Sequence, residues 1–404
     1  MKKLLSVLLA VLLLVTFTGC KEKEPEQKKF KVGMVCIGDN NEGYTAAHYN
    51  GLVAACKKYD CEEPVFKFNC GEGGEKVQNA LEDLVEEGCD LIISNSYGHQ
   101  SYTLEVAKAN PNIAFVASTG DNAAASGLDN LGNAFPSTYQ SRYVAGVVAG
   151  MKLAELEAEG KLSAENYDEN GNVIIGYVSA YAYAECISGY TAYYLGVRSV
   201  FEKVVMYVTY TSEWSNATLE KAGAEALLAK GAVIISQHAD TVGAPSAVEA
   251  AHVEAGKEVY CVGYNVSMLN VAPNAALTSA TNNWEVAYSK IIETVMAGQS
   301  FKDWNAGYEN AAVGITELGK NVAAGTAEKV AEVTEALTSG KLHVFDVSTF
   351  TVNGQPISDN ASCVDLYYLD AIPGAAVYDG YFHESEYRSA PYFAAIIDGI
   401  VSID

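Results

Sequence analysis

The stretch Gly231–Thr241 (GAVIISQHADT) ends in three side chains that can exchange hydrogen bonds or protons, namely Gln237, His238 and Asp240. The apolar, β-branched residues before them predict a buried strand, so the polar groups come at its carboxyl end. His238 and Asp240 are two residues apart and could face the same way on a strand. Zinc sites need three or four ligands, and a further histidine would have to come from elsewhere, so we predict no metal site and no cofactor.

A second stretch, Gly88–His99 (GCDLIISNSYGH), repeats the pattern of glycine, apolar run and polar tip, and its tip includes Ser96 and Tyr97. Each copy follows an amphipathic helical pattern, LEDLVEE before the first and AEALLAK before the second. The two stretches therefore predict the same helix–strand unit used twice. The polar tips are the candidate ligand-binding residues.

The duplication extends further along the chain. Lys31–Ile37 and Val173–Ser179 read as strands that each precede a helix, and each helix is followed by another strand, Val65–Phe68 or Val204–Tyr210. This order predicts an α/β protein with two Rossmann-like lobes. Because ligands bind outside the carboxyl ends of parallel strands, two lobes that face each other through those ends would enclose a cleft.

The expected lobes are discontinuous in sequence. Asn130–Tyr139 reads as the first segment that crosses from one lobe to the other. Ala276–Asn282 reads as a strand that returns the chain to the first lobe. We therefore predict a first lobe of residues 30–135 plus 276–312 and a second of 136–275 plus 313–404, joined by crossings that act as a hinge. Within the second, HVFDVSTFTVNGQPI predicts a hairpin that turns at Asn353-Gly354. We expect the Tyr-rich C-terminal extension to brace the second lobe, with a partner surface as the alternative.

The N-terminus reads as an export signal. Lys2 and Lys3 precede the apolar run Leu4–Val15, which is short for a membrane span. The small residues before Cys20 resemble a bacterial lipobox, from which Phe17 departs. We predict a signal peptide (1–19), lipidation at Cys20 and a linker (20–29) that leave the protein anchored to the outside of the cell membrane. Ordinary secretion is the alternative.

The composition indicates a large, exported globular protein. The 404 residues favour two domains, and the net charge of −24 argues against a nucleic-acid partner. Beyond Cys20 no apolar run reaches the length of a membrane span. Of the nine cysteines, Cys36, Cys89 and Cys261 lie in or beside strand patterns, which favours buried free thiols over disulfides.

Seven segments in order are similar to the basic membrane protein family of lipoproteins. Members are substrate-binding proteins of ABC importers, and they include purine nucleoside receptors. The resemblance implies a type I periplasmic binding protein fold, an ABC permease as partner and a purine base or nucleoside as ligand. The segments are KVGMVCIGDNNEGYTAAHYNGL, DLIIS, FPSTYQSRYVAGVVAG, GAVIISQHADT, KEVYCVGYN, LTSATNNWEVAYSKII and KLHVF.

The resemblance also implies roles for single residues. Asn40 or Asn41 and then Tyr44 match the loop that holds an acidic or amide residue and a stacking aromatic. Trp214 matches a second aromatic that contacts the ligand. Structural alternatives are that Tyr44 packs at a helix start, that Asn40 caps that helix and that Trp214 packs within its lobe. Gln237, His238 and Asp240 would form the second lobe's polar edge.

The sequence departs from the family where nucleoside-binding members hold ribose. Those members have an Asp and a Lys at the positions of Asn265 and Asn282, and Trp284 follows two residues later. We include all three as candidate ligand-binding residues. The departures favour a purine base or an altered nucleoside over an ordinary nucleoside.

No GxSxG, GxxxxGK[ST] or HExxH motif occurs in the sequence. We therefore predict a binding protein and not an enzyme. A nucleosidase-like enzyme would need a carboxylate pair such as Asp39 and Asp240. A surface adhesion or interaction lipoprotein is the alternative from another class.

Overall fold

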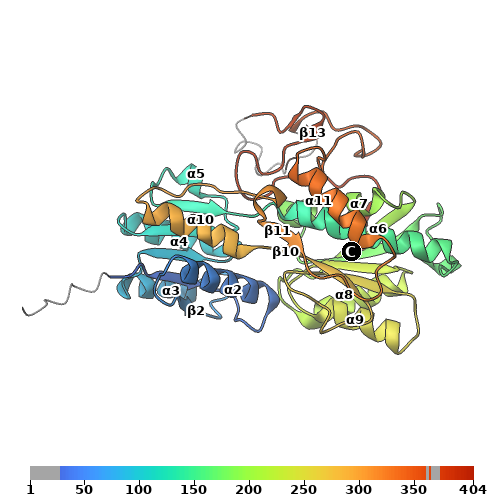
Figure 1. Cartoon of the computed structure of the whole chain (residues 1–404), viewed down its shortest axis with the longest axis horizontal. Helices are drawn as coiled ribbons and strands as arrows, with labels where there is room; N and C mark the ends of the chain where they lie inside the picture. Colours follow the sequence, from blue (N-terminus) through green and yellow to red (C-terminus); the bar gives the residue numbers. More distant parts are fainter. Residues whose placement is uncertain (1–27, 361–363, 365–373) are drawn as a thin grey trace, which may run out of the picture.

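Two separate β-sheets form the frameworks of two lobes in the computed structural model, which describes residues 28–360, 364 and 374–404 (Figure 1). The expected signal peptide, Cys20 and Cys363 lie outside the described residues. Among the residues described, no helix has the length and apolar character needed to cross a membrane. The two-lobed α/β fold confirms the prediction.

The first lobe is a parallel five-stranded sheet in the order β2-β1-β3-β4-β5. Its central strand β3 is buried along its whole length, as the apolar run LIIS predicts. Gly88, which precedes it, has a φ of +75°, a conformation that glycine adopts at little cost. The elements are β1 Val32–Val35, α2 Gly43–Lys58, β2 Val65–Lys67, α3 Glu75–Glu86, β3 Leu91–Ser94, α4 Gln100–Ala109, β4 Ala114–Ser118, α5 Ala123–Ser126 and β5 Leu131–Ala134.

The second lobe is a seven-stranded sheet in the order β11-β10-β9-β8-β6-β7-β14, in which only the β10–β11 pairing is antiparallel. β6 and β7 have the predicted bounds. The elements are α6 Thr138–Ala158, β6 Val173–Ser179, α7 Ala184–Arg198, β7 Val204–Tyr210, α8 Ala217–Ala229, β8 Ile234–His238, α9 Gly243–Val253, β9 Tyr260–Tyr264, β10 Ala276–Asn282, β11 Val313–Ile315, α11 Thr326–Thr338 and β14 Ile400–Ser402.

The strand β10 corrects the expected lobe boundary. It pairs with β9 and β11 in the second sheet, so the prediction that Ala276–Asn282 returns the chain to the first lobe is wrong. The helix that follows, α10 (Trp284–Met296), does pack on α2 of the first lobe (Figure 1). The contact is close, because a Cβ added at Gly51 would lie 2.6 Å from the Cβ of Trp284. The chain therefore crosses from the second lobe to the first between β10 and α10.

The crossings are tied to one another by side chains. Thr138, at the start of α6, donates a hydrogen bond to Asn282 at the end of β10 (2.8 Å). Asn305 accepts from Ser137 (2.6 Å) and donates to the carbonyl of Phe135 (2.7 Å). Adjacent segments that pass between two lobes are typical of a hinge.

The described part of the C-terminal extension (345–360, 364 and 374–404) packs on the second lobe. Phe345, Tyr392 and Phe393 are buried in the main core of that lobe, and β14 adds a parallel strand beside β7. Val352 and Gln355 pair in antiparallel fashion across the predicted Asn353-Gly354 turn, and the pairing is a single bridge. A small hairpin lies further on, between β12 (Val377–Tyr378) and β13 (Tyr381–Phe382).

The described cysteines are unpaired, and all except Cys61 are buried. Burial raises the pKa of the Cys89 thiol to about 11 and that of the Cys56 thiol to about 12. Thiols of this kind are protonated and behave as small apolar groups. The expectation of free thiols is confirmed for the described residues.

Candidate functional site

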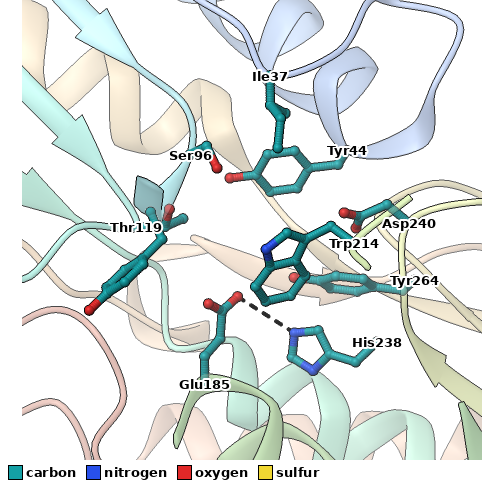
Figure 2. A pocket seen from close by; sticks show the side chains of 10 residues that line it. Ile37, Tyr44, Ser96, Thr119, Glu185, Trp214, His238, Asp240 and Tyr264 are labelled. Atoms are coloured by element: carbon teal, nitrogen blue, oxygen red, sulfur yellow. Dashed lines mark ion pairs between the residues drawn. The ribbon is translucent and has the colours of Figure 1, made fainter. Parts of the chain in front are cut away.

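A narrow cavity lies between the lobes at the carboxyl ends of the strands, where the cleft was predicted. Its walls come from the segments that follow β1, β3 and β4 in the first lobe and from those at or after the ends of β6, β7, β8 and β9 in the second. The lining residues are Ile37, Tyr44, Ser96, Tyr97, Thr119, Glu185, Trp214, His238, Asp240 and Tyr264 (Figure 2).

Tyr44 is positioned by the start of α2. Glu42 caps this helix, and its carboxylate accepts hydrogen bonds from the backbone N–H groups of Tyr44 (2.5 Å) and Thr45 (3.0 Å). The Tyr44 hydroxyl donates to the carbonyl of Asn95 after β3. Asn95 in turn accepts from the N–H of Ile37 (2.9 Å). The ring is therefore fixed by two strand ends of its own lobe.

Trp214 approaches the cavity from the second lobe, and Figure 2 shows its ring across the cavity from that of Tyr44. Its carbonyl accepts a hydrogen bond from the N–H of Asp240 (2.8 Å), which links the loops after β7 and β8. Its indole packs edge-on against Tyr181, with ring centroids 5.2 Å apart. Two aromatic faces from opposite lobes are thus brought to one site.

Glu185 and His238 form the floor of the cavity. Burial, and then the charge of Glu72, raise the pKa of Glu185 to about 8. Burial, and then the charge of Arg142, hold the pKa of His238 well below its usual value. Near neutral pH both groups are therefore uncharged, one a protonated acid and the other a neutral imidazole. Neither ring nitrogen of His238 has a hydrogen-bond partner within the described chain.

Arg142 lies beneath this floor. Its guanidinium stacks on the ring of Tyr264 at 3.7 Å and donates to the carbonyl of Gln237 (2.5 Å). Cation–π stacking holds the tyrosine ring in place. The cationic charge is buried in α6 and stays close enough to the cavity to lower the pKa of Glu185 in part.

Asp240 is the acidic group on the second lobe's side. Burial, and then the nearby charge of Glu42, raise its pKa well above the usual value, and a hydrogen bond from Asn265 opposes that shift. The amide of Asn265 donates to Oδ1 of Asp240 at 2.8 Å. Asn265 therefore orients the acidic group and does not itself line the cavity.

The twelve candidate residues fall into two groups. Tyr44, Ser96, Tyr97, Trp214, His238 and Asp240 line the cavity, whereas Asn40, Asn41, Gln237, Asn265, Asn282 and Trp284 do not.

Several residues of the second group have other contacts. Asn40 and Asn41 are exposed, and Glu42 caps the helix in place of Asn40. The amide of Gln237 donates to the carbonyls of Ala239 and Thr241 and so shapes the loop. Asn282 accepts from Thr138 at the crossing.

Trp284 belongs to the core of the first lobe. It is 2% exposed and stacks on His48, with ring centroids 3.8 Å apart. Trp284 is the first residue of α10, which packs on α2 of the first lobe, whereas Asn282 ends β10 of the second sheet.

Four lining residues were not among the sequence candidates: Ile37, Thr119, Glu185 and Tyr264. The equivalent helices of the two lobes explain the position of one of them. Tyr44 is the second residue of α2 and Glu185 the second residue of α7, and these helices follow the first strand of each lobe. The two residues therefore occupy equivalent positions at the starts of corresponding helices.

The cavity is small in this arrangement of the lobes, with a volume of about 30 Å³. A bicyclic ring therefore enters only if the lobes separate, which the hinge permits. Within the described ranges, no cluster of three or more His, Cys, Asp or Glu residues could hold a metal ion. The site has aromatic faces and uncharged polar edges, a combination suited to a flat heterocycle.

Comparison with known proteins identifies the family of the chain. A family model described as ABC transporter substrate-binding protein PnrA-like matches residues 29–344. A purine-binding protein of Brucella abortus (strain 2308) is 28% identical over 329 residues, which cover 79% of this chain and 84% of that relative. A protein of Haloferax volcanii, provisionally named an ABC transporter glucose-binding protein, is 27% identical over 316 residues, 78% of this chain and 73% of the relative.

Solved structures support the fold. A solute-binding protein of an ABC transporter system from Conexibacter woesei superposes with a TM-score of 0.61 at 19% identity, covering 78% of this chain and 98% of its own. The family match extends over most of the sequence, including both sheets apart from β14. The chain therefore belongs to the PnrA-like family of ABC transporter substrate-binding proteins.

Proposed function

We propose that this protein captures a purine base or nucleoside between its lobes and delivers it to the permease of an ABC importer. The observation that carries the proposal is the placement of Tyr44 and Trp214, from opposite lobes, on one cavity. A ring held between two aromatic faces gains roughly 1–3 kcal/mol per stacking partner. The Brucella relative, which is named as purine-binding, supports the same ligand class.

The polar groups suit the edges of a purine. Protonated Glu185 can donate a hydrogen bond, and the neutral imidazole of His238 can donate through one nitrogen and accept through the other. Both groups and Asp240 belong to the second lobe, whereas Tyr44 and Ser96 belong to the first. A ligand that contacts both lobes favours the closed state through its differential affinity.

Export and anchoring form the second part of the proposal. Because the family consists of ABC transporter substrate-binding proteins, we place the protein outside the cytoplasmic membrane, held by a lipid on Cys20. Expression of the full chain and of Cys20→Ala, followed by detergent-phase partitioning, tests this. The anchored protein enters the detergent phase, and Cys20→Ala moves to the aqueous phase. Equal partitioning of the two would contradict lipidation at this residue.

A binding screen tests the ligand class. Purified protein is titrated calorimetrically with purine bases, nucleosides, pyrimidines and sugars, with glucose included because of the name of the Haloferax relative. Mass spectrometry of ligand extracted from the freshly purified protein accompanies the titrations. We expect the purines alone to bind. Tighter binding of a sugar, or no binding by any purine, would overturn the proposal.

The same samples address an enzymatic alternative. Asp39, one half of the carboxylate pair that a nucleosidase would use, does not line the cavity, and its carboxylate accepts hydrogen bonds from Asn41. We therefore expect inosine to be recovered intact after incubation. Release of free hypoxanthine would show turnover.

A further inference from the structure

The C-terminal extension forms one wall of a second compartment, which we call the outer compartment. Arg388, Ala390 and Pro391 of the extension face Asp121 and Phe135 across it, and its volume is about 350 Å³. These extension residues lie beyond residue 344, where the family match ends. The wall is therefore a feature of this chain that the family model does not describe.

The outer compartment adjoins the cavity between Tyr44 and Trp214. Tyr97, Thr119 and Glu185 line both. A ligand whose ring occupies the inner cavity can therefore extend a substituent past these residues into the outer compartment. The larger volume outside and the narrow slot inside suit a flat ring that carries a bulkier group.

Arg388 is held rigidly at this wall. Its Nε donates to the carbonyl of Ala390 (3.2 Å) and its Nη2 to that of Pro391 (2.9 Å). Its Nη1 lies 3.2 Å from Oδ2 of Asp121, in the loop after β4 of the first lobe. The side chains are only 8% and 11% exposed, so this ion pair joins the extension to the first lobe in a largely water-excluded place.

The Asp121 carboxylate has capacity for a further donor. The hydroxyl of Tyr97 (3.4 Å) and the guanidinium of Arg388 (3.2 Å) both reach Oδ2. A carboxylate offers about four acceptor positions over its two oxygens. The hydroxyl of a ligand can therefore donate to Asp121 without displacing Arg388.

The charges of the outer compartment disfavour an anion. Arg388 supplies one positive charge, and Asp121 already balances it. A phosphate would therefore have to compete with the Asp121 carboxylate for the guanidinium. Phe135, Tyr183 and Pro391 complete the lining with apolar surface, which matches the carbon faces of an uncharged ring.

We propose that the outer compartment receives an uncharged, hydroxylated substituent of the ligand, such as the sugar of a nucleoside, and that Asp121 and Arg388 determine this specificity. The inference rests on the proposed purine-binding function. It places the sugar contacts away from Asn265 and Asn282, the positions that the family resemblance implied. Those two side chains are already engaged with Asp240 and Thr138.

Calorimetric titration of the full chain with adenine, adenosine and AMP, and with hypoxanthine, inosine and IMP, tests the proposal. We expect each nucleoside to bind roughly tenfold or more tightly than its base, the gain from one charge-assisted hydrogen bond. Each monophosphate should bind more weakly than its nucleoside. Asp121→Asn and Arg388→Gln should remove most of the nucleoside's advantage and leave base affinity within about twofold.

Tyr183→Ala provides a variant with little risk to folding, because Tyr183 is 50% exposed and lines only the outer compartment. It should weaken nucleoside binding selectively. Ile396→Ala is the matched control, since Ile396 is exposed on the same extension and lines neither the cavity between Tyr44 and Trp214 nor the outer compartment.

Equal affinity for base and nucleoside in the wild-type protein would overturn this inference and leave the proposed function standing. So would variants that weaken base and nucleoside equally, or a monophosphate that binds more tightly than its nucleoside. Failure of every purine to bind the wild-type protein would overturn both.

Discussion

Nε2 of His238 lies 3.6 Å from Oε1 of Glu185, beyond the usual length of a hydrogen bond, although both side chains are largely buried at the floor of the cavity. The pair is therefore not a tight ion pair. An acid whose pKa is raised and an imidazole whose pKa is lowered stand side by side as neutral groups. The edge of a ligand that reaches both groups can accept a hydrogen bond from the protonated Glu185 and can also bond to the neutral imidazole of His238.

This relationship predicts how the stability of the protein depends on pH. In the unfolded chain the Glu185 carboxyl has a pKa of 4.5, and in the folded protein about 8. The folded state therefore binds more protons in this window, and Glu185 lowers the free energy of unfolding as pH rises from about 4.5 to about 8. His238 acts the other way, because its lowered pKa costs stability only as pH falls below 6.5.

Glu185→Gln mimics the protonated acid and isolates that contribution. We expect this variant to gain stability relative to wild type as pH is raised from 5 to 8.5, measured by urea unfolding at both values. Glu213→Gln serves as the control, since Glu213 is exposed on the loop after β7. An identical difference between Glu185→Gln and wild type at both pH values would contradict the raised pKa.

The two aromatic walls should contribute to ligand affinity by stacking. Trp214→Ala and Tyr44→Ala should each weaken purine binding by roughly 1–3 kcal/mol, which is about 5- to 150-fold in Kd. Tyr378→Ala is the aromatic control, because its ring stacks on His383 in the extension and lines neither compartment. Titration of the three variants with the best-binding purine measures the effect. Loss of thermal stability with unchanged Kd in Trp214→Ala would assign that residue to lobe packing.

Asn265 combines a side-chain role with a backbone role. Its amide donates to Asp240, and its φ is +65°, a conformation that costs most other residues energy. Asn265→Gly keeps the backbone conformation and removes the hydrogen bond, so we expect a loss of roughly 1–3 kcal/mol from leaving Asp240 without its donor. Asn265→Ala should lose more, by about the additional 1–2 kcal/mol of left-handed strain.

Chemical denaturation of these two variants separates the contributions. The order wild type, Asn265→Gly, Asn265→Ala is expected in the free energy of unfolding. Equal stability of Asn265→Gly and wild type would show that the hydrogen bond to Asp240 contributes little.

Sequence patterns predicted the elements well but not the partners of each element. Val173–Ser179 and Val204–Tyr210 were located because a run of apolar residues reports burial. Ala276–Asn282 has the same buried character in either sheet, and only its pairing with β9 and β11 assigns it to the second. Which sheet a strand joins depends on contacts far away in sequence, and hydrophobic periodicity does not record them.

The site was predictable to the extent that it follows strand ends. Ser96, Tyr97, His238 and Asp240 come directly at or after β3 and β8, so the βα rule located them. Gln237 alternates with His238 along the strand, and its amide turns into the loop and not into the cavity. Residue type suggests what a side chain can bind, whereas the local backbone decides where it points.

Trp284 provides the sharpest test of that distinction, because the family resemblance made it a ligand candidate and the structure places it in a core. Its ring lies against His48 and Tyr288, and its backbone leaves no room for a side chain at Gly51. Trp284→Ala should therefore lower the free energy of unfolding by about 3–5 kcal/mol, and Trp284→Phe by less. Binding of the best purine to folded Trp284→Phe should have the Kd of wild type within about twofold, because a core substitution leaves the cavity walls in place. Thermal melts and titrations of the same samples decide the matter: a large rise in Kd with an unchanged melting temperature would return Trp284 to the ligand site.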